Sequence, residues 1–176
     1  MKLKGADFLM LEVNEVFVYG NNGVCRLDEI RSEDILGKKC MCYILTPVFD
    51  DHSKFYVPVN NETLTASIRP VMVKEKLHEM VVGAVNSDMS WEQNDRKRGE
   101  TFHSIIVGGL SQDLLTVMKI LLSRKKELRS TVRRLHSADE KALAACKKIV
   151  GEEFAYAFGV DVNDALSHIE QELTAA

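Results

Sequence analysis

The first part of the chain alternates short runs of β-branched and aromatic residues with clusters of turn residues. Runs bounded in this way by Gly, Asn, Asp or Pro are typical of β-strands. We expect five strands, at residues 16–19, 24–31, 40–46, 54–57 and 64–69, with turns at residues 20–23 and 34–37 and a polar loop at residues 50–53. Five short strands in about 60 residues predict a small, strongly bent sheet or barrel.

After Pro70 the apolar residues recur every three or four positions, which is the period of an amphipathic helix. These stripes predict helices around residues 77–84, 91–107, 111–135, 137–158 and 161–173. Ser90 and Ser111 are expected to cap two of them, and Ser137 with Glu140 fits a capping box. The predicted fold class is α+β, with a β domain over residues 1–70 and an all-α helical domain over residues 71–176.

The composition is that of a folded protein with room for a core. The chain has 176 residues, of which 45% are hydrophobic and 28% charged, and this length allows one medium domain or two small ones. No apolar run approaches the ~18 residues that a membrane helix needs. The apolar stretch near the N-terminus is broken by charges and does not predict a signal peptide. With four cysteines and no secretory signal, we expect a cytoplasmic protein.

Motifs that would indicate an enzyme are absent. The sequence has no phosphate-binding glycine loop, no Gly-x-Ser-x-Gly, no His-Glu-x-x-His and no Cys-x-x-Cys. Cys40 and Cys42 share one face of a predicted strand, but only His52 lies close enough in sequence to help them bind a metal, so a core position is favoured. Glu152 and Glu153 are expected on a solvated helix face. No catalytic residue, cofactor, metal, small-molecule substrate or membrane is predicted.

The net charge of −3 hides a strong asymmetry. Residues 91–134 carry ten basic and five acidic side chains, whereas residues 135–176 carry three basic and eight acidic ones. The only tryptophan, Trp91, begins the basic segment and is followed by Arg96, Lys97 and Arg98. Cations bind nucleic-acid phosphates, and an apolar ring can wedge between base steps. A solvated helix face and a tryptophan packed on its own helix explain the same pattern, and both interpretations stay open at this point.

Several segments resemble the CarD family of transcription regulators, whose N-terminal module is shared with transcription-repair coupling factors. They are residues 12–23, 43–45, 55–61 and 68–70, then Trp91 with Arg96, and finally residues 135–141 and 152–156, in the family's order. The resemblance implies a Tudor-like β module that docks on the β subunit of bacterial RNA polymerase. It also implies a helical domain that contacts promoter DNA at the upstream edge of the transcription bubble, with a tryptophan in the minor groove.

The resemblance assigns candidate contact residues. On the DNA side these are Trp91, Arg96 and Lys141, and local charge adds Lys97 and Arg98. On the polymerase side, the matching strand and its alternation indicate Lys54 and Tyr56, and Glu33 lies near the family's other contact position. The sequence therefore predicts a non-enzymatic regulator that bridges RNA polymerase and promoter DNA, largely without sequence specificity, and influences open-complex stability. The alternative is a polymerase-bound adaptor whose helical domain binds another protein and not DNA.

Overall fold

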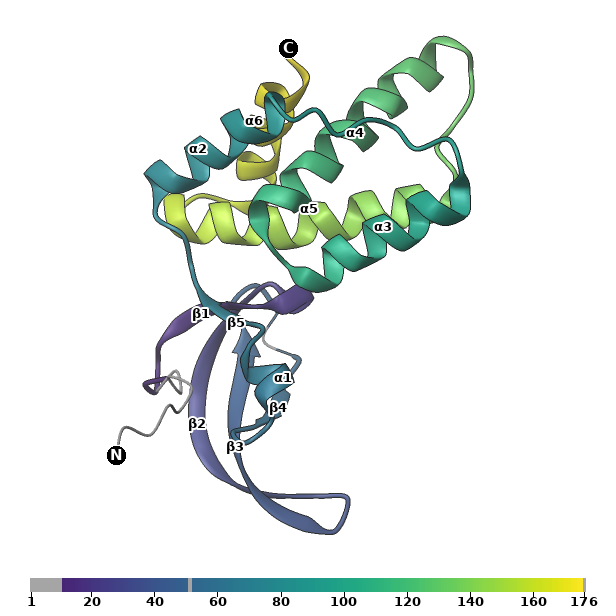
Figure 1. Cartoon of the computed structure of the whole chain (residues 1–176). Coiled ribbons are helices and arrows are strands. Elements are labelled where there is room, and N and C mark those ends of the chain that lie inside the picture. Colours follow the sequence, from purple (N-terminus) through teal and green to yellow (C-terminus); the bar gives the residue numbers. More distant parts are fainter. Residues whose placement is uncertain (1–10, 51, 176) are drawn as a thin grey trace, which may run out of the picture.

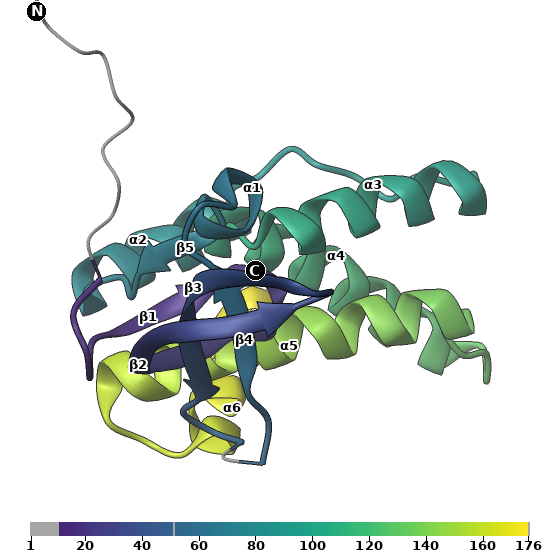
Figure 2. The ribbon, with the colours of Figure 1, turned by 90° about the horizontal axis from the view of Figure 1, so that it is seen from below.

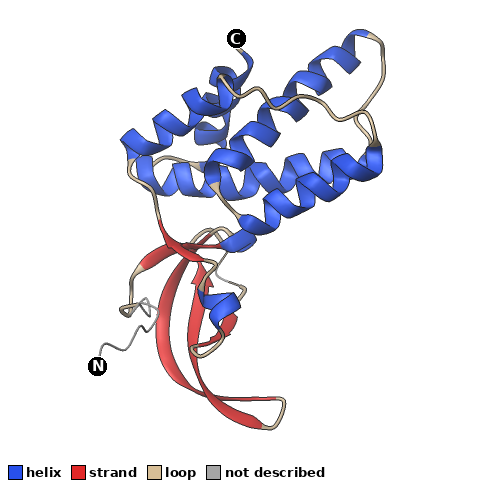
Figure 3. Cartoon of the chain, viewed as in Figure 1, coloured by secondary structure: helices blue, strands red, loops and turns tan. Residues whose placement is uncertain are grey.

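The computed structural model describes residues 11–50 and 52–175, which form a sheet with a layer of helices on one side of it (Figures 1 and 3). The expectations about residues 1–10, including the absence of a signal peptide, lie outside the described residues. The helices gather above the strands, and the segregation of the two kinds of element confirms the predicted α+β class. Among the described residues, no helix is long and apolar enough to cross a membrane.

The sheet has five antiparallel strands in the order β4-β3-β2-β1-β5. Their bounds are Val16–Tyr19 for β1, Val24–Ile35 for β2, Lys38–Pro47 for β3, Phe55–Pro58 for β4 and Ile68–Pro70 for β5. The β2–β3 hairpin is longer than predicted and projects away from the helices (Figure 1). Its turn has Leu36 and Gly37 at φ of 54° and 79°, the left-handed pair of a tight hairpin turn.

The prediction of a strand over residues 64–69 is wrong in its first half. Asn61 accepts a hydrogen bond from the backbone N–H of Leu64, so it caps a one-turn helix, α1 (Glu62–Thr65). The side chain of Ser67 then donates to the carbonyl of Leu64, which closes this turn before β5 begins. Local side-chain bonds to the backbone have therefore replaced ladder bonds here. The predicted turn after β1 is a single 3-10 turn, η1 (Gly20–Asn22).

Five longer helices follow β5, as predicted. They are α2 (Lys74–Val85), α3 (Asp95–Gly108), α4 (Ser111–Ser130), α5 (Ser137–Phe158) and α6 (Val162–Thr174). Helix α4 contacts the other four and buries most of its first three turns. Its apolar stripe from Leu114 to Leu121 therefore forms the centre of the helical layer.

The predicted start of α3 is wrong by a few residues, and the predicted caps of α3 and α5 are wrong. Helix α3 begins at Asp95 and is capped by Asn94, not by Ser90, so Trp91 lies in the loop before it. Helix α5 is capped by His136, whose Nδ1 accepts from a backbone N–H, so the expected capping box at Ser137 is not formed. Asn and Ser cap helices about equally well, so the residue type alone did not identify the boundary.

Two clusters of buried side chains hold the layers together. One face of the sheet forms the first cluster with Phe17, Cys25, Leu27 and Leu45. On the opposite face, Val18 and Val24 pack into the helical core. Seen from below (Figure 2), the strands cross beneath α5. Because both faces of β1 and of the start of β2 are buried, this part of the sheet is fixed against the helices.

Candidate functional site

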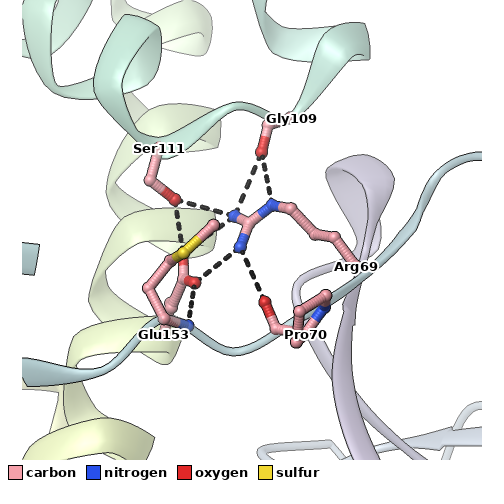
Figure 4. Close-up of polar contacts among 6 residues, drawn as sticks. Arg69, Pro70, Gly109, Ser111 and Glu153 are labelled. Atoms are coloured by element: carbon pink, nitrogen blue, oxygen red, sulfur yellow. Dashed lines mark hydrogen bonds and ion pairs between the residues drawn. The ribbon is translucent and has the colours of Figure 1, made fainter. Parts of the chain in front are cut away.

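A buried ion pair joins the sheet to the helices at the end of β5 (Figure 4). The guanidinium of Arg69 donates to both carboxylate oxygens of Glu153 on α5, at 2.6 and 2.8 Å. It also donates to the carbonyl of Gly109 and to the hydroxyl of Ser111. Glu153 is fully buried and additionally accepts from the backbone N–H of Met72 and from the Ser111 hydroxyl. One arginine thus connects β5, the start of α4 and the C-terminal part of α5.

The neighbouring Glu152 makes a second contact across the same junction. Its Oε2 accepts the backbone N–H of Val24 at 3.1 Å. A Cβ on Gly23 would lie 1.9 Å from this oxygen, so the approach requires glycine. Burial raises the pKa of Glu152, and the Val24 hydrogen bond opposes that shift only partly. The prediction that Glu152 and Glu153 lie on a solvated face is therefore wrong.

Trp91 is partly buried against the helical core and not held out into solvent. The guanidinium of Arg98 lies over its ring, 4.1 Å from the centroid, and that of Arg124 on α4 lies 5.2 Å away. A cation over an indole face is attracted by the ring quadrupole. In this conformation the packed interpretation of Trp91 holds, although the ring packs on the helical core from the loop before α3 and not on a helix of its own.

Arg98 is the one predicted DNA contact that lies inside the protein. Only 3% of its side chain is exposed, and it donates two hydrogen bonds to the carboxylate of Asp139 on α5, at 3.0 and 2.8 Å. It also donates to the Glu92 carbonyl and to Asp95. These hydrogen bonds, chiefly those to Asp139, raise the pKa of Arg98. The expectation of Arg98 on a DNA-facing surface is corrected, because its guanidinium is occupied.

The other predicted DNA contacts lie on the surface. Arg96 and Lys97 on α3 are largely exposed, but Arg96 pairs with Glu100 at 2.9 Å and Lys97 with Glu92 at 3.1 Å. Lys141 on α5 is exposed and lines a groove of about 310 Å³ between α3 and α5. Trp91, Arg98 and Asp139 are thus brought together by the fold, whereas Arg96 and Lys97 point to acidic neighbours of their own.

The three predicted polymerase contacts share one face of the sheet. Tyr56 is 46% exposed while Val57 is buried, and Lys54, two residues earlier, is exposed, as the strand alternation predicts. Tyr56 pairs with Ile44, which pairs in turn with Glu29 on β2. Glu33 is four residues after Glu29 on the same strand and therefore faces the same side. On that side the guanidinium of Arg31 donates hydrogen bonds to the carboxylates of both Glu29 and Glu33.

The cysteines are free thiols that pack in the interior. Cys25, Cys42 and Cys146 are buried, and Cys40 is half-buried with its sulfur 3.6 Å from that of Cys42. Burial raises the pKa of Cys42 to about 11, so its thiol stays protonated and is a poor nucleophile. Within residues 11–50 and 52–175, no three His, Cys, Asp or Glu side chains are placed to hold a metal ion.

The residues that sequence reasoning missed are Arg69 and its partner Glu153, together with Asp139. A weak signal existed for Glu153, which lies three residues after Val150 and seven after Cys146 and thus falls on the apolar stripe of its helix. An acidic residue on such a stripe is buried only when it has a partner. The partner is 84 residues away in the sequence, so the pair could not be read from local pattern.

Comparison with known families identifies the sheet. The family model for the CarD-like/TRCF RID domain matches residues 11–72, from just before β1 to just after β5. A comparison with curated proteins finds no sequence match. The β module is therefore an RNA-polymerase-interacting domain of a transcription-related protein. Residues 11–72 thus carry the domain that CarD-like proteins share with transcription-repair coupling factors, which confirms the predicted resemblance for this part.

Proposed function

We propose that the protein is a bacterial transcription regulator that binds the RNA polymerase β subunit and promoter DNA at the upstream edge of the transcription bubble. The match of residues 11–72 to the CarD-like/TRCF RID domain carries this proposal. The β domain of residues 1–70 holds polymerase, and the helical domain of residues 71–176 reaches the DNA. The protein performs no catalysis and acts in the cytoplasm, where RNA polymerase works.

The exposed outer part of the sheet is the proposed polymerase contact. Tyr56, Lys54 and Glu33 share one side of the sheet, which packs on the helices only at its other end, through Val18 and Val24. The β2–β3 hairpin carries this side away from the helices (Figure 1). Exposed aromatic residues at the centre of an interface often carry much of the binding energy. The charged side chains around Tyr56 would then orient the partner more than they strengthen the complex.

The junction between the sheet and the helices is fixed, and this couples polymerase binding by the sheet to DNA binding by the helices. Arg69 and Glu153 tie β5 to α4 and α5, and Val18 packs into the helical core. A polymerase-bound sheet therefore sets the position of the helices, so that DNA binding becomes an intramolecular event with a high effective concentration. Contacts made only with the opened promoter shift the equilibrium between closed and open complexes. Trp91, Arg96, Lys97 and Lys141 remain the candidate contacts at this edge.

Co-precipitation of the full-length chain with the polymerase β subunit tests the first contact. Replacing Tyr56 by Ala together with Lys54→Glu is expected to weaken binding about tenfold or more. Lys76→Glu on α2 is the matched charge reversal, because Lys76 is also exposed and lies on the helical side. Equal binding by both variants would contradict the assigned face.

Permanganate reactivity of a promoter bubble tests the second contact. The wild type is expected to raise the reactivity of melted thymines, and Trp91→Ala to lower it by up to about tenfold, as expected for the loss of a ~1–3 kcal/mol stacking contact. Trp91→Phe keeps an aromatic ring and should retain part of the effect. Identical reactivity with all three proteins would exclude the wedge.

One observation favours the alternative adaptor function. The three cations that follow Trp91 are all paired with carboxylates, whose negative charge opposes contact with phosphates. An adaptor would bind polymerase but would leave bubble reactivity unchanged in both wild type and variants. The two experiments together therefore separate the regulator from the adaptor.

A further inference from the structure

Four cations at the end of α4 and in the turn after it are exposed and have no carboxylate partner among the residues that the structure describes. They are Lys126, Arg129, Arg133 and Arg134, here called the α4-end surface. The end of α4 lies far from the sheet, at the upper right of Figure 1. This surface contrasts with the Trp91 loop, where Arg96, Lys97 and Arg98 are all paired.

The surface is grooved on two sides. A groove of about 580 Å³ runs between α4 and α6 and is lined by Lys126, Arg129 and Lys147. A second, of about 430 Å³, is lined by Arg129, Arg133 and Arg134. Lys125 also lines both, although it pairs with Glu140 at 3.0 Å. The unpaired cations Lys126 and Arg129 lie on the α4 wall of the first groove, whereas Lys147 on α5 pairs with Glu170 at 2.6 Å. Clustered positive charge along a groove concentrates the field and attracts a polyanion.

The helix dipole explains only part of this arrangement. A cation in the last turn of a helix is favourable, which accounts for Arg129. It does not account for Arg133 and Arg134, which lie beyond the helix and repel the other cations. The cluster therefore costs stability without a compensating contact inside the described chain, which is expected where the charges serve a partner.

The backbone of the turn supports the same conclusion. Helix α4 ends in a Schellman arrangement, with the N–H of Arg133 bonded to the carbonyl of Leu128 and that of Val132 to Arg129. The left-handed position of this motif is normally glycine, but here it is Val132, with φ of 59° and a side chain 95% exposed. A β-branched residue in this conformation is strained, and such strain clusters at binding sites.

We infer that the α4-end surface binds the phosphate backbone of DNA, without reading its sequence. Arginine forms paired hydrogen bonds with phosphate, and three of the four cations are arginines. The surface and the candidate site both involve α4, because Arg124, which lies over the Trp91 ring, is on the same helix as Lys126 and Arg129. Duplex next to a bubble edge at Trp91 would then run along the end of α4. This inference rests on the proposed function and moves the main phosphate contact from α3 to α4.

The test compares two double variants of the full-length chain that each remove two positive charges. Arg129→Gln with Arg133→Gln alters the α4-end surface, and Arg96→Gln with Lys97→Gln alters the paired cations of α3. Binding to a short forked DNA duplex is followed by fluorescence anisotropy over a range of salt concentrations. Thermal unfolding of both variants checks that they fold like the wild type.

Each phosphate contact contributes a slope of about 0.9 to the plot of log affinity against log salt. The α4-end variant is expected to lower the slope by about 2 and the affinity by roughly 10- to 100-fold at about 0.1 M salt. The α3 variant is expected to change affinity by less than about twofold, because Glu100 and Glu92 beside its cations repel phosphates and offset their attraction. Equal losses in the two variants, or no loss in either, would overturn the inference.

Other outcomes are equally decisive. If the wild type fails to bind the duplex at low salt but binds a poly-glutamate peptide through Arg129 and Arg133, the surface serves an acidic protein and the DNA assignment fails. Both double variants should still co-precipitate with polymerase. If the wild type itself does not co-precipitate with polymerase, the proposed function is refuted, whereas the DNA-binding result is judged separately.

Discussion

The loop around Trp91 and the end of α4 carry similar runs of basic residues but differ in what the charges contact. At the first, Arg98 is buried against Asp139, and Arg96 and Lys97 each pair with a glutamate. At the second, the four cations of the α4-end surface have no acidic partner in the part of the chain that the structure describes. The difference shows that a count of cations does not identify a nucleic-acid surface. What matters is whether the helices packed alongside have already neutralised them.

Among these substitutions, the largest loss of stability is expected for Arg98→Ala. Removing one partner of a buried pair leaves an uncompensated charge, here on Asp139, and is expected to lower the free energy of unfolding by about 3–5 kcal/mol. Urea denaturation followed by circular dichroism measures this loss. Arg96→Ala is the control two residues away, and its exposed pair should change stability by no more than about 0.5 kcal/mol.

An unchanged unfolding midpoint for Arg98→Ala, together with weaker DNA binding, would contradict the structural role. Arg98 would then be a surface contact, as the basic run in the sequence suggested. Asp139→Asn provides the reciprocal check, because it leaves Arg98 buried without its strongest acceptor. Both variants should lose stability if the pair acts as a unit.

Glu153→Gln extends the comparison to the junction between sheet and helices. The change keeps the shape but removes the charge that faces Arg69, whose side chain is 16% exposed. We expect a loss of roughly 2–3 kcal/mol, less than for Arg98 because solvent partly screens Arg69 and the Gly109 carbonyl still accepts from it. Glu170→Gln on α6 is the control, since its pair with Lys147 is about one-third exposed and should contribute less than about 1 kcal/mol. Equal losses in the two variants would mean that burial at the junction is unimportant.

In the loop around Trp91, the variant Trp91→Ala measures how much the packing of the ring stabilises the protein in the absence of DNA. The ring is partly buried and lies under two guanidinium groups, so its removal is expected to lower the free energy of unfolding by about 1–2 kcal/mol. Thermal unfolding without DNA measures this contribution. Trp91→Phe should recover part of it because the cation–π contacts persist in weaker form. A wild-type melting temperature for Trp91→Ala would show that the ring does not pack in the free protein.

Much of the architecture could be predicted from local pattern. The run at residues 16–19, the change of period after Pro70 and the alternation around Tyr56 each depend on neighbours in the sequence, and the structure agrees with them. Helix caps were predicted less accurately: Asn94 competed with a serine of similar capping strength, and His136 caps α5 in place of Ser137. The wrong cap of α3 placed Trp91 in a helix, whereas it lies in the loop before that helix.

The charged interior could not be predicted in the same way. Glu153 was expected in solvent because acidic residues are usually exposed, and its burial depends on Arg69, 84 residues earlier. Arg98 was expected to meet phosphate, but the packing of α3 on α5 places Asp139 beside it. Such pairs arise from tertiary contacts between distant elements. The same limitation applies to the α4-end surface, where the informative feature is the absence of partners within the described chain.

The smallest expected effect concerns Glu152, which is buried like Glu153 but has a backbone N–H in place of an arginine. Burial raises its pKa above the ordinary value of 4.5, so the folded state holds this proton more tightly than the unfolded state. The stabilisation is complete below the ordinary pKa and is lost as the pH rises through the raised one. Glu152→Gln should therefore remove a decline in stability that the wild type shows with rising pH. Urea midpoints of both proteins between about pH 4 and pH 8 measure this difference. Parallel curves would show that Val24 N–H alone satisfies the carboxylate, and that a buried charge at this junction needs no cation.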